Sequence, residues 1–427
     1  MHISDNDKGH IYKWRVLIGC FFSYMFDALD MIVLSISLPF IIKEWKLSLT
    51  DAGLIGTATL IGVGFGGILA GWIADNYGRK KVLYFCLAMF SLLTGSLAFT
   101  HSWAQLTTLR FIAGLGLGGV WGPMAALINE AWPPHQRGRA SGALLSSFPL
   151  GVIITALASQ IILPAYGWRA MFMLGFLGLI PSFYVYFFVP ESDTWKEQKK
   201  KSGSRKEKIS IAEILAPGLI KGTILGTMIA LINAASYWGI AVWLPTFLLE
   251  ERGMEVAQMA SFITYQNIGY LLGFLVSGYL KDKINDRLLM GIMFLMGGTF
   301  VSSIVIIRDI TILSFSGFIV GLFYSVGTPM MTYFSSIFPT RVRALGVGTC
   351  FNVGRGISAL APVTLGAIAT KYDIGTGIMV CGALFACGAV VCAFLPKPLE
   401  SVAGEDIRET SFSMKECPMV SKTEQQG

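Results

Sequence analysis

Charged side chains are scarce in this sequence. Asp, Glu, Lys and Arg make up 14% of its 427 residues, whereas 54% of the residues are hydrophobic and the mean hydropathy is +0.62. Soluble domains carry about 25% charged residues, so the composition excludes a soluble globular domain and indicates an integral membrane protein.

Histidine and paired cysteine are also scarce. The four histidines (2, 10, 101 and 135) lie outside the apolar runs, so a proton relay inside a membrane would have to use carboxylates. The seven cysteines have no CxxC spacing and most lie in apolar runs, so we expect no disulfide framework, metal site or other cofactor. The first apolar run is too long for the apolar part of a signal peptide, so no cleavable signal is expected.

Long apolar runs are abundant. A helix of about 20 apolar residues crosses the hydrocarbon core, and the runs are continuous rather than alternating, which excludes membrane strands. Twelve segments qualify. They predict an all-α membrane protein with transmembrane helices at about 14–39, 53–74, 82–100, 106–129, 142–164, 170–189, 219–248, 258–280, 288–307, 311–336, 344–368 and 376–396.

Lys and Arg are unevenly distributed between the loops. With the N-terminus in the cytoplasm, 24 of the 33 lie in inside segments, six in outside loops and three within helices. Cytoplasmic loops carry the excess of basic residues, so both termini are predicted to be inside, in a protein of the cell membrane. The net charge of +7 then reflects topology, and nucleic acid is not an expected partner.

One long polar segment divides six helices from six. The sequence therefore predicts an N-terminal six-helix bundle (1–190), a cytoplasmic linker (191–216), a C-terminal six-helix bundle (217–396) and a cytoplasmic tail (397–427). The tail is polar and lacks apolar periodicity, so it is expected to be disordered. The basic residues of the linker also fit contact with anionic lipid.

The two halves repeat short loop sequences. GWIADNYGRKK (71–81) is echoed by GYLKDKINDR (278–287), and PHQRGRASG (134–142) is echoed by PTRVRALG (339–346). Two pseudo-symmetric six-helix repeats around a midplane site are an architecture of secondary transporters. Glycines spaced four apart predict close helix packing: Gly114, Gly118 and Gly122 on helix 4, and the pairs Gly62/Gly66 and Gly67/Gly71 on helix 2.

In this order and spacing the motifs resemble those of the major facilitator superfamily. GWIADNYGRKK is similar to the superfamily's loop between helices 2 and 3, and RFIAGLGLGGVWG (110–122) is similar to its helix-4 motif. FDALD (26–30) and YWGIAVWLPTFL (237–248) resemble helices 1 and 7 of its aromatic-acid and sialic-acid proton symporters. The resemblance implies the same twelve-helix fold and transport by alternating access.

Two carboxylates interrupt the first apolar run. Asp27 and Asp30 are spaced i, i+3 and share one helix face, and Asp27 lies about 20 Å into a helix that starts near Trp14. A buried carboxyl group beside another is suited to reversible protonation, and intramembrane acids mark ion pathways. The alternative is a permanently protonated or hydrogen-bonded aspartate that only locks helix packing.

Two arginines are the expected counter-charges. The resemblance implies that Arg110 pairs with the helix-1 aspartate, which Asp30 matches best, so Asp30 is the expected proton site; the alternative is an arginine that extends to the outer headgroups. Arg355 and Asn352 are expected to bind an anionic substrate, because guanidinium binds carboxylates with two hydrogen bonds and keeps its proton. The alternative for Arg355 is an internal ion pair with Asp27 or Asp30.

The predicted membrane interior holds two acids and two arginines. Binding one carboxylate would make it negative and one proton would restore neutrality, which predicts one proton per monocarboxylate. Tyr237, Trp238 and Gln266 are candidates to hold a planar ring and its polar edge, although packing is an ordinary role for such residues. By resemblance, a cytoplasmic ion-pair latch consists of Asp75, Arg79, Glu130 and Arg139, with Asp282 as the counterpart in the second half; ordinary loop charge is the alternative.

These observations predict a transporter rather than an enzyme. We expect a proton-coupled secondary transporter, monomeric in the lipid bilayer, that imports a small organic anion such as a monocarboxylate or aromatic acid. An antiporter or exporter of organic anions or amphiphiles is the first alternative, and a non-transporting receptor on the same fold is the second.

Overall fold

The computed structural model describes residues 5–133, 136–192, 195–197, 211–280, 283–339 and 342–397. Within these ranges every regular element is a helix, as the continuous apolar runs predict. The first half contains α1 (Asp5–Trp45), α2 (Leu49–Tyr77), α3 (Arg79–Ser96), α4 (Trp103–Ala131), α5 (Arg137–Met173) and α6 (Leu179–Phe188). The second half contains α8 (Ile220–Thr246), α9 (Val256–Leu280), α10 (Asp286–Ile306), α11 (Ile310–Tyr324), α12 (Gly327–Ile337), α13 (Arg343–Ser358), α14 (Ala361–Lys371) and α15 (Ile374–Phe394). Short helical turns lie at Leu97–Phe99, Leu174–Gly178, Ile211–Leu215 and Phe247–Glu251.

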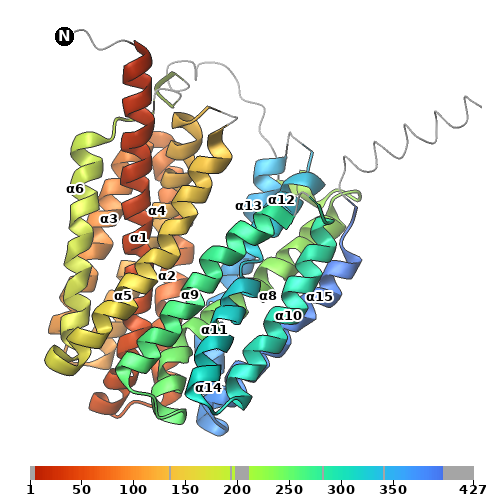
Figure 1. Cartoon of the computed structure of the whole chain (residues 1–427). Coiled ribbons are helices and arrows are strands. Elements are labelled where there is room, and N and C mark those ends of the chain that lie inside the picture. The colour runs from red at the N-terminus through yellow and green to blue at the C-terminus, as the bar shows by residue number, and fades with distance from the viewer. Residues whose placement is uncertain are drawn as a thin grey trace, which may run out of the picture.

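The helices form two bundles. Figure 1 shows α1 to α6 on the left and α8 to α15 on the right. Most of the predicted linker 191–216 and the tail after residue 397 lie outside the described residues. The predicted boundaries of the linker and the tail therefore stay predictions.

Among the residues that the structure describes, eleven helical stretches are long and apolar enough to cross a membrane. One of them, Arg139–Phe188, has 50 residues, and at 1.5 Å per residue it would be about 75 Å long, more than twice the hydrocarbon thickness. The chain turns within this stretch at Gly167, whose φ of 75° lies in the left-handed region that glycine adopts without steric cost. The stretch therefore supplies two crossings, which makes twelve.

Two spans that the sequence predicts as continuous helices are interrupted. The tenth breaks at Ser325, between α11 and α12, and the eleventh breaks at Ala359–Leu360, between α13 and α14. In each case a proline lies four residues after a serine: Pro329 follows Ser325, and Pro362 follows Ser358. Proline has no N–H to donate to the carbonyl four residues earlier, and its ring clashes with that carbonyl. The prediction of continuous helices is wrong at these two points.

Helices α2 and α4 pack backbone against backbone. A Cβ atom on Gly62 would meet a carbonyl of α4, and one on Gly118 would meet a carbonyl of α2, so these positions have no room for a side chain. The predicted seam of small residues is confirmed there, but it does not reach Gly71 and Gly122, beside which a Cβ atom would meet open space.

The second half repeats this seam between α9 and α11. A Cβ atom on Gly269 or Gly273 would meet a carbonyl of α11. These two glycines precede Gly278 by the same spacings as Gly62 and Gly66 precede Gly71. The repeat seen in the loop sequences is therefore also a repeat of helix packing.

Each half has a carboxylate clamp at the end opposite the N-terminus, called the outer end below. Glu44, at the end of α1, accepts hydrogen bonds from Trp168 Nε1 (2.6 Å) and Arg169 Nη1 (2.8 Å), which ties the first span to the sixth. Glu251, just after α8, accepts from two backbone N–H groups at the start of α15 (2.6 and 3.0 Å), which ties the seventh span to the twelfth. Equivalent spans are thus joined in both halves.

The two halves are hydrogen-bonded to each other at this outer end. The Thr50 and Thr370 hydroxyl oxygens lie 3.1 Å apart, and the Val363 amide donates to Thr57 Oγ1 at 3.2 Å. Both bonds join the first part of α2 to α14, which Figure 1 shows near the lower edge of the molecule. The outer seam, defined as the contact between Leu49–Thr57 and α14, is therefore closed in this structure.

Candidate functional site

Asp30 and Arg110 form a buried ion pair between α1 and α4. Arg110 Nη1 lies 3.1 Å from Asp30 Oδ2 and 3.2 Å from Asp30 Oδ1. Arg110 is 0% exposed and Asp30 is 1% exposed, so Arg110 does not extend to the headgroups. Burying two charges is tolerable only when they neutralise each other and their remaining hydrogen-bonding capacity is satisfied.

Two threonines complete the hydrogen bonding of this pair. The Thr94 hydroxyl of α3 donates to Asp30 Oδ1, and Thr59 Oγ1 of α2 accepts from Arg110 Nε at 3.3 Å. Sequence reasoning missed both, because a threonine in an apolar helix commonly bonds the backbone of its own helix. Thr59 also does this, through Ile55. Only the packing of four helices brings the two hydroxyls to the charges.

Asp27 lies one turn before Asp30 but has a different environment. It is half-buried, and Arg355 of α13, in the other half of the molecule, is close enough to interact with it electrostatically. No direct ion pair joins Asp27 and Arg355 among the residues that the structure describes. The two charges therefore interact electrostatically between the halves without forming a direct ion pair.

Arg355 retains hydrogen-bonding capacity. Its Nε atom is buried and has no hydrogen-bond partner within the described part of the chain. A buried donor without a partner costs about 1–3 kcal/mol, more for a charged group. An acceptor supplied by a ligand, such as a carboxylate oxygen, would remove that cost.

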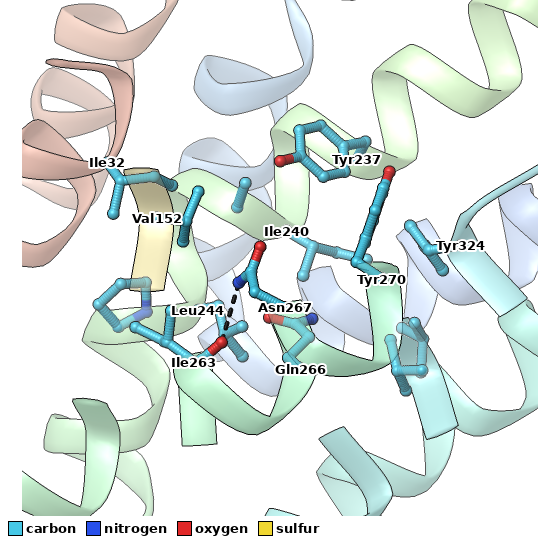
Figure 2. Close-up of a pocket in the computed structure, with 14 residues that line it drawn as sticks. Ile32, Val152, Tyr237, Ile240, Leu244, Ile263, Gln266, Asn267, Tyr270 and Tyr324 are labelled. Atoms are coloured by element: carbon cyan, nitrogen blue, oxygen red, sulfur yellow. Dashed lines mark hydrogen bonds between the residues drawn. The ribbon is translucent and has the colours of Figure 1, made fainter. Parts of the chain in front are cut away.

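A small enclosed cavity lies between the halves (Figure 2). Its volume is about 40 Å³, which gives room for water rather than for a ring-sized ligand in this state. Fourteen residues from both halves line it, and none of them is charged. The lining combines aliphatic side chains with the Tyr237 ring and the amides of Gln266 and Asn267. Such a lining suits the uncharged body of an organic molecule rather than its carboxylate.

Of the four predicted substrate-binding residues other than Arg355, two line this cavity and two do not. Tyr237 and Gln266 point into it. Trp238 is absent from the lining and packs edge-on against Tyr237, with 5.0 Å between ring centroids. Asn352 also lies outside the lining and is exposed. Arg355, the anion-binding candidate, is not among the lining residues either, so Arg355 and the cavity form separate parts of the candidate site.

Three further tyrosines, which the sequence did not single out, lie in or near the interior of the molecule. Tyr270 and Tyr324 line the cavity, and the Tyr270 ring centroid lies 5.9 Å from that of Tyr237. Tyr24 packs against Trp121 and Phe148 at 5.1 and 5.2 Å. In an apolar run a single tyrosine carries no signal that separates packing from ligand contact, so only the tertiary structure identifies them.

The end of the molecule that carries the N-terminus has its own charged cluster. Arg79 Nη2 lies 3.4 Å from Glu130 Oε1. Glu191, which the sequence analysis did not select, accepts from the backbone N–H groups of Arg79 (3.0 Å) and Lys80 (3.2 Å) and so caps α3. Gly78 precedes this cap with φ 114°, a conformation that favours glycine.

For the other three members of the predicted latch, Asp75, Arg139 and Asp282, contact with this cluster stays a prediction. Arg139 is exposed. The side chain of Asp75 and the whole of Asp282 lie outside the described residues, so the second latch stays a prediction.

Comparison of the sequence with known protein families identifies the family of this chain. The family model of the Major Facilitator Superfamily matches residues 20–265 and 226–421. The chain belongs to the major facilitator superfamily. Among curated proteins, the cis,cis-muconate transport protein of Acinetobacter baylyi is 30% identical over 404 residues, which cover 92% of this chain and 97% of that protein. The benzoate transport protein of the same species is 26% identical over 404 residues, covering 85% and 84% of the two chains.

Solved structures agree on the fold of this superfamily member. The inward-open xylose transporter XylE from E. coli superposes with a TM-score of 0.73 over 92% of this chain and 100% of that one, at 18% identity. The chain is therefore a multi-pass membrane transporter whose curated relatives carry aromatic acids and related metabolites. The buried Asp30–Arg110 pair, Arg355 and the uncharged cavity are the parts of this superfamily fold that can carry its chemistry.

Proposed function

We propose that the protein is a proton-coupled secondary transporter of the cell membrane that imports a small organic anion, a monocarboxylate or aromatic acid, by alternating access. Arg355 binds the carboxylate, the uncharged cavity receives the body of the molecule, and Asp30 carries the proton. The observation that supports this most is Arg355, whose buried Nε has no hydrogen-bond partner among the described residues, whereas Arg110 is paired with Asp30.

The charge balance supports coupling to protons. Asp30 and Arg110 neutralise each other, and Asp27 and Arg355 face each other across the halves. A bound carboxylate adds one negative charge, and protonation of Asp30 removes one, so a loaded carrier with one proton is neutral overall. A neutral interior is the least costly to carry through a closed state.

The relatives support the class of substrate. Two similar proteins are a cis,cis-muconate transport protein and a benzoate transport protein, and both muconate and benzoate are organic anions. The uncharged lining around Tyr237, Gln266 and Asn267 offers aromatic faces and amide groups to such a molecule. The proposal is that this chain transports one member of that chemical class as a monomer in the bilayer.

Transport into proteoliposomes tests the proposal. Labelled benzoate, 4-hydroxybenzoate and cis,cis-muconate are offered with an inside-alkaline pH gradient, with an inside-negative potential, and with neither. For benzoate and 4-hydroxybenzoate, which carry one carboxylate each, we expect the pH gradient to drive accumulation of at least one acid and the potential alone to have little effect, because the loaded carrier with one proton is neutral. Muconate carries two carboxylates and would need two protons for a neutral loaded carrier. Accumulation driven by potential without a pH gradient would contradict the one-to-one stoichiometry.

The same experiment separates the alternatives. Acidifying the outside accelerates uptake by a symporter and slows uptake by a proton antiporter or exporter. A receptor on this fold would bind the acids and move none of them. Binding without movement under any gradient would therefore reject transport of these acids as the function.

A further inference from the structure

The outer seam contains one buried hydrogen bond between the two halves. The Val363 amide of α14 donates to Thr57 Oγ1 of α2 at 3.2 Å, and the Thr57 side chain is buried, 4% exposed. The other bond across the seam, between Thr50 and Thr370, lies in an exposed position where water can replace either partner. The two bonds therefore differ in what is lost when they break.

The Val363 amide needs a partner from outside its helix because of the helix break. In a continuous helix it would donate to the carbonyl of Ala359, but the chain is interrupted at Ala359–Leu360, and Val363 stands in the first turn of α14. The first amides of a helix have no partner within it. Thr57 of the opposite half supplies the missing acceptor.

The neighbouring carbonyl, that of Pro362, is held within the second half, to which it belongs. Trp243 Nε1 of α8 donates to the Pro362 oxygen at 2.9 Å, and Trp243 is fully buried. One peptide unit, Pro362–Val363, is thus anchored to the second half through its oxygen and to the first half through its N–H. Gly53 of α2 faces the Pro362–Val363 backbone, where a Cβ atom would meet the Pro362 oxygen, and Gly56 faces the Pro362 and Val242 side chains.

We propose that Thr57 is the latch of an outer gate. Its hydroxyl holds the Pro362–Val363 peptide and keeps the halves together at the outer end, and opening of the outer side requires this bond to break. The break between α13 and α14 gives α14 a point at which it can move relative to α13. Thr59, two residues further along α2, holds Arg110, so the same segment contacts both the gate and the buried ion pair.

The proposal predicts a specific effect of removing the acceptor. In Thr57→Val the closed state keeps its packing but buries an amide without a partner, whereas the open state, in which water reaches the amide, is unaffected. Losing one such bond shifts the ratio of open to closed molecules by about five- to ten-fold toward open. Thr57→Ser keeps the hydroxyl and is expected to behave as the parent protein does.

Distance measurement across the seam tests this without a substrate. Spin labels are attached at Ala104→Cys on α4 and Lys371→Cys at the end of α14, both exposed positions at the outer end, after the exposed Cys387 and the tail Cys417 are replaced by serine. Electron–electron distance distributions are recorded for the parent, Thr57→Val, Thr57→Ser and Thr50→Val. We expect a longer-distance population to grow in Thr57→Val alone.

Each outcome decides the proposal. Growth of the long-distance population in Thr57→Val, with Thr57→Ser and Thr50→Val unchanged, supports the latch. An unchanged distribution in a folded, monodisperse Thr57→Val protein rejects it, and so does an equal change in Thr57→Ser, because that would assign the effect to packing. If Thr57→Val does not fold, a shift toward open in Thr57→Ala supports the proposal, and no shift rejects it. No substrate is present, so a failure of the organic-anion proposal would leave this result intact.

Discussion

Arg110 and Asp30 face each other inside the first bundle, with Arg110 Nη1 3.1 Å from Asp30 Oδ2 and neither side chain open to solvent. The pair ties α4 to α1 near the middle of the first span. Its two partners depend on each other, since either charge alone would be buried without compensation. Changes to this pair should therefore alter both stability and coupling.

Removing the arginine alone should destabilise the protein strongly. We expect Arg110→Met to lower the free energy of unfolding by about 3–5 kcal/mol, because it leaves the Asp30 carboxylate buried without a partner. The double variant Asp30→Asn/Arg110→Met should recover part of this loss, since no lone charge remains. Thermal unfolding in detergent measures both. A double variant that is less stable than Arg110→Met would contradict the argument.

Neutralising the aspartate should uncouple transport from protons. Asp30→Asn cannot release or take up a proton, so we expect pH-driven accumulation in proteoliposomes to fall more than ten-fold while exchange of labelled for unlabelled acid continues. Asp27→Asn, one turn away on the same helix, is the comparison: it keeps Asp30 but leaves the loaded carrier with one positive charge, so accumulation should persist and should also respond to an inside-negative potential. If Asp30→Asn still accumulates the acid, another group carries the proton.

Replacing the candidate anion-binding arginine should remove acid binding. Arg355→Ala is expected to weaken binding of the transported acid about 10- to 100-fold, the loss typical of a charged hydrogen bond. Arg355→Lys should recover only part of the affinity, because lysine cannot form the paired hydrogen bonds of a guanidinium. The acid-induced rise in the unfolding temperature reports binding, with exposed Lys371→Ala as the control for lost positive charge. An undiminished rise in Arg355→Ala would exclude this residue from the site.

A glycine pair on α4 tests the helix seam. Gly118→Ala should lower stability by about 1–3 kcal/mol, because its new methyl group would be forced against an α2 carbonyl. Gly122→Ala, one turn later on the same helix, places its methyl group in open space, so it should not destabilise the protein and should gain up to about 1 kcal/mol from the higher helix propensity of alanine. Thermal unfolding compares the two. Equal effects would show that helix propensity, and not the seam, determines them.

A reversible cross-link tests whether the outer end must open. The Thr50 and Thr370 oxygens lie 3.1 Å apart, so Thr50→Cys/Thr370→Cys places two thiols across the seam. Oxidation should stop transport and reduction should restore it, because alternating access requires the halves to separate there. Each single cysteine variant is the control. Unchanged transport in the fully cross-linked protein would contradict a moving outer gate.

Most of the architecture could be predicted from particular residues. The apolar runs gave the number of crossings, and the loop repeats gave the relation between the halves, because hydrophobic length and local motifs are properties of contiguous sequence. Pro329 and Pro362 account for the interruptions at Ser325 and Ala359–Leu360. Proline alone does not locate such breaks, because Pro39, Pro123 and Pro245 lie inside helices that continue past them.

Only the charged residues of the candidate site could be predicted from the sequence. Asp30, Arg110 and Arg355 stand out because a charge in an apolar run is costly and demands a reason. Thr94, Thr59 and the tyrosines around the cavity do not stand out, because the same side chains serve packing or bond their own helix in most apolar runs.

The sequence by itself determined that this chain crosses a membrane twelve times, that its halves repeat, and which interior charges need explanation. The tertiary structure alone decided which charge meets which, since Asp30 and Arg110 are brought together by helix packing and not by spacing along the chain. It also decided that the Val363 amide, left without a partner by a local helix break, finds its acceptor on Thr57 of the opposite half. Hydrophobicity and proline act within a segment, whereas pairing between segments depends on how closely their surfaces pack, which no single segment encodes.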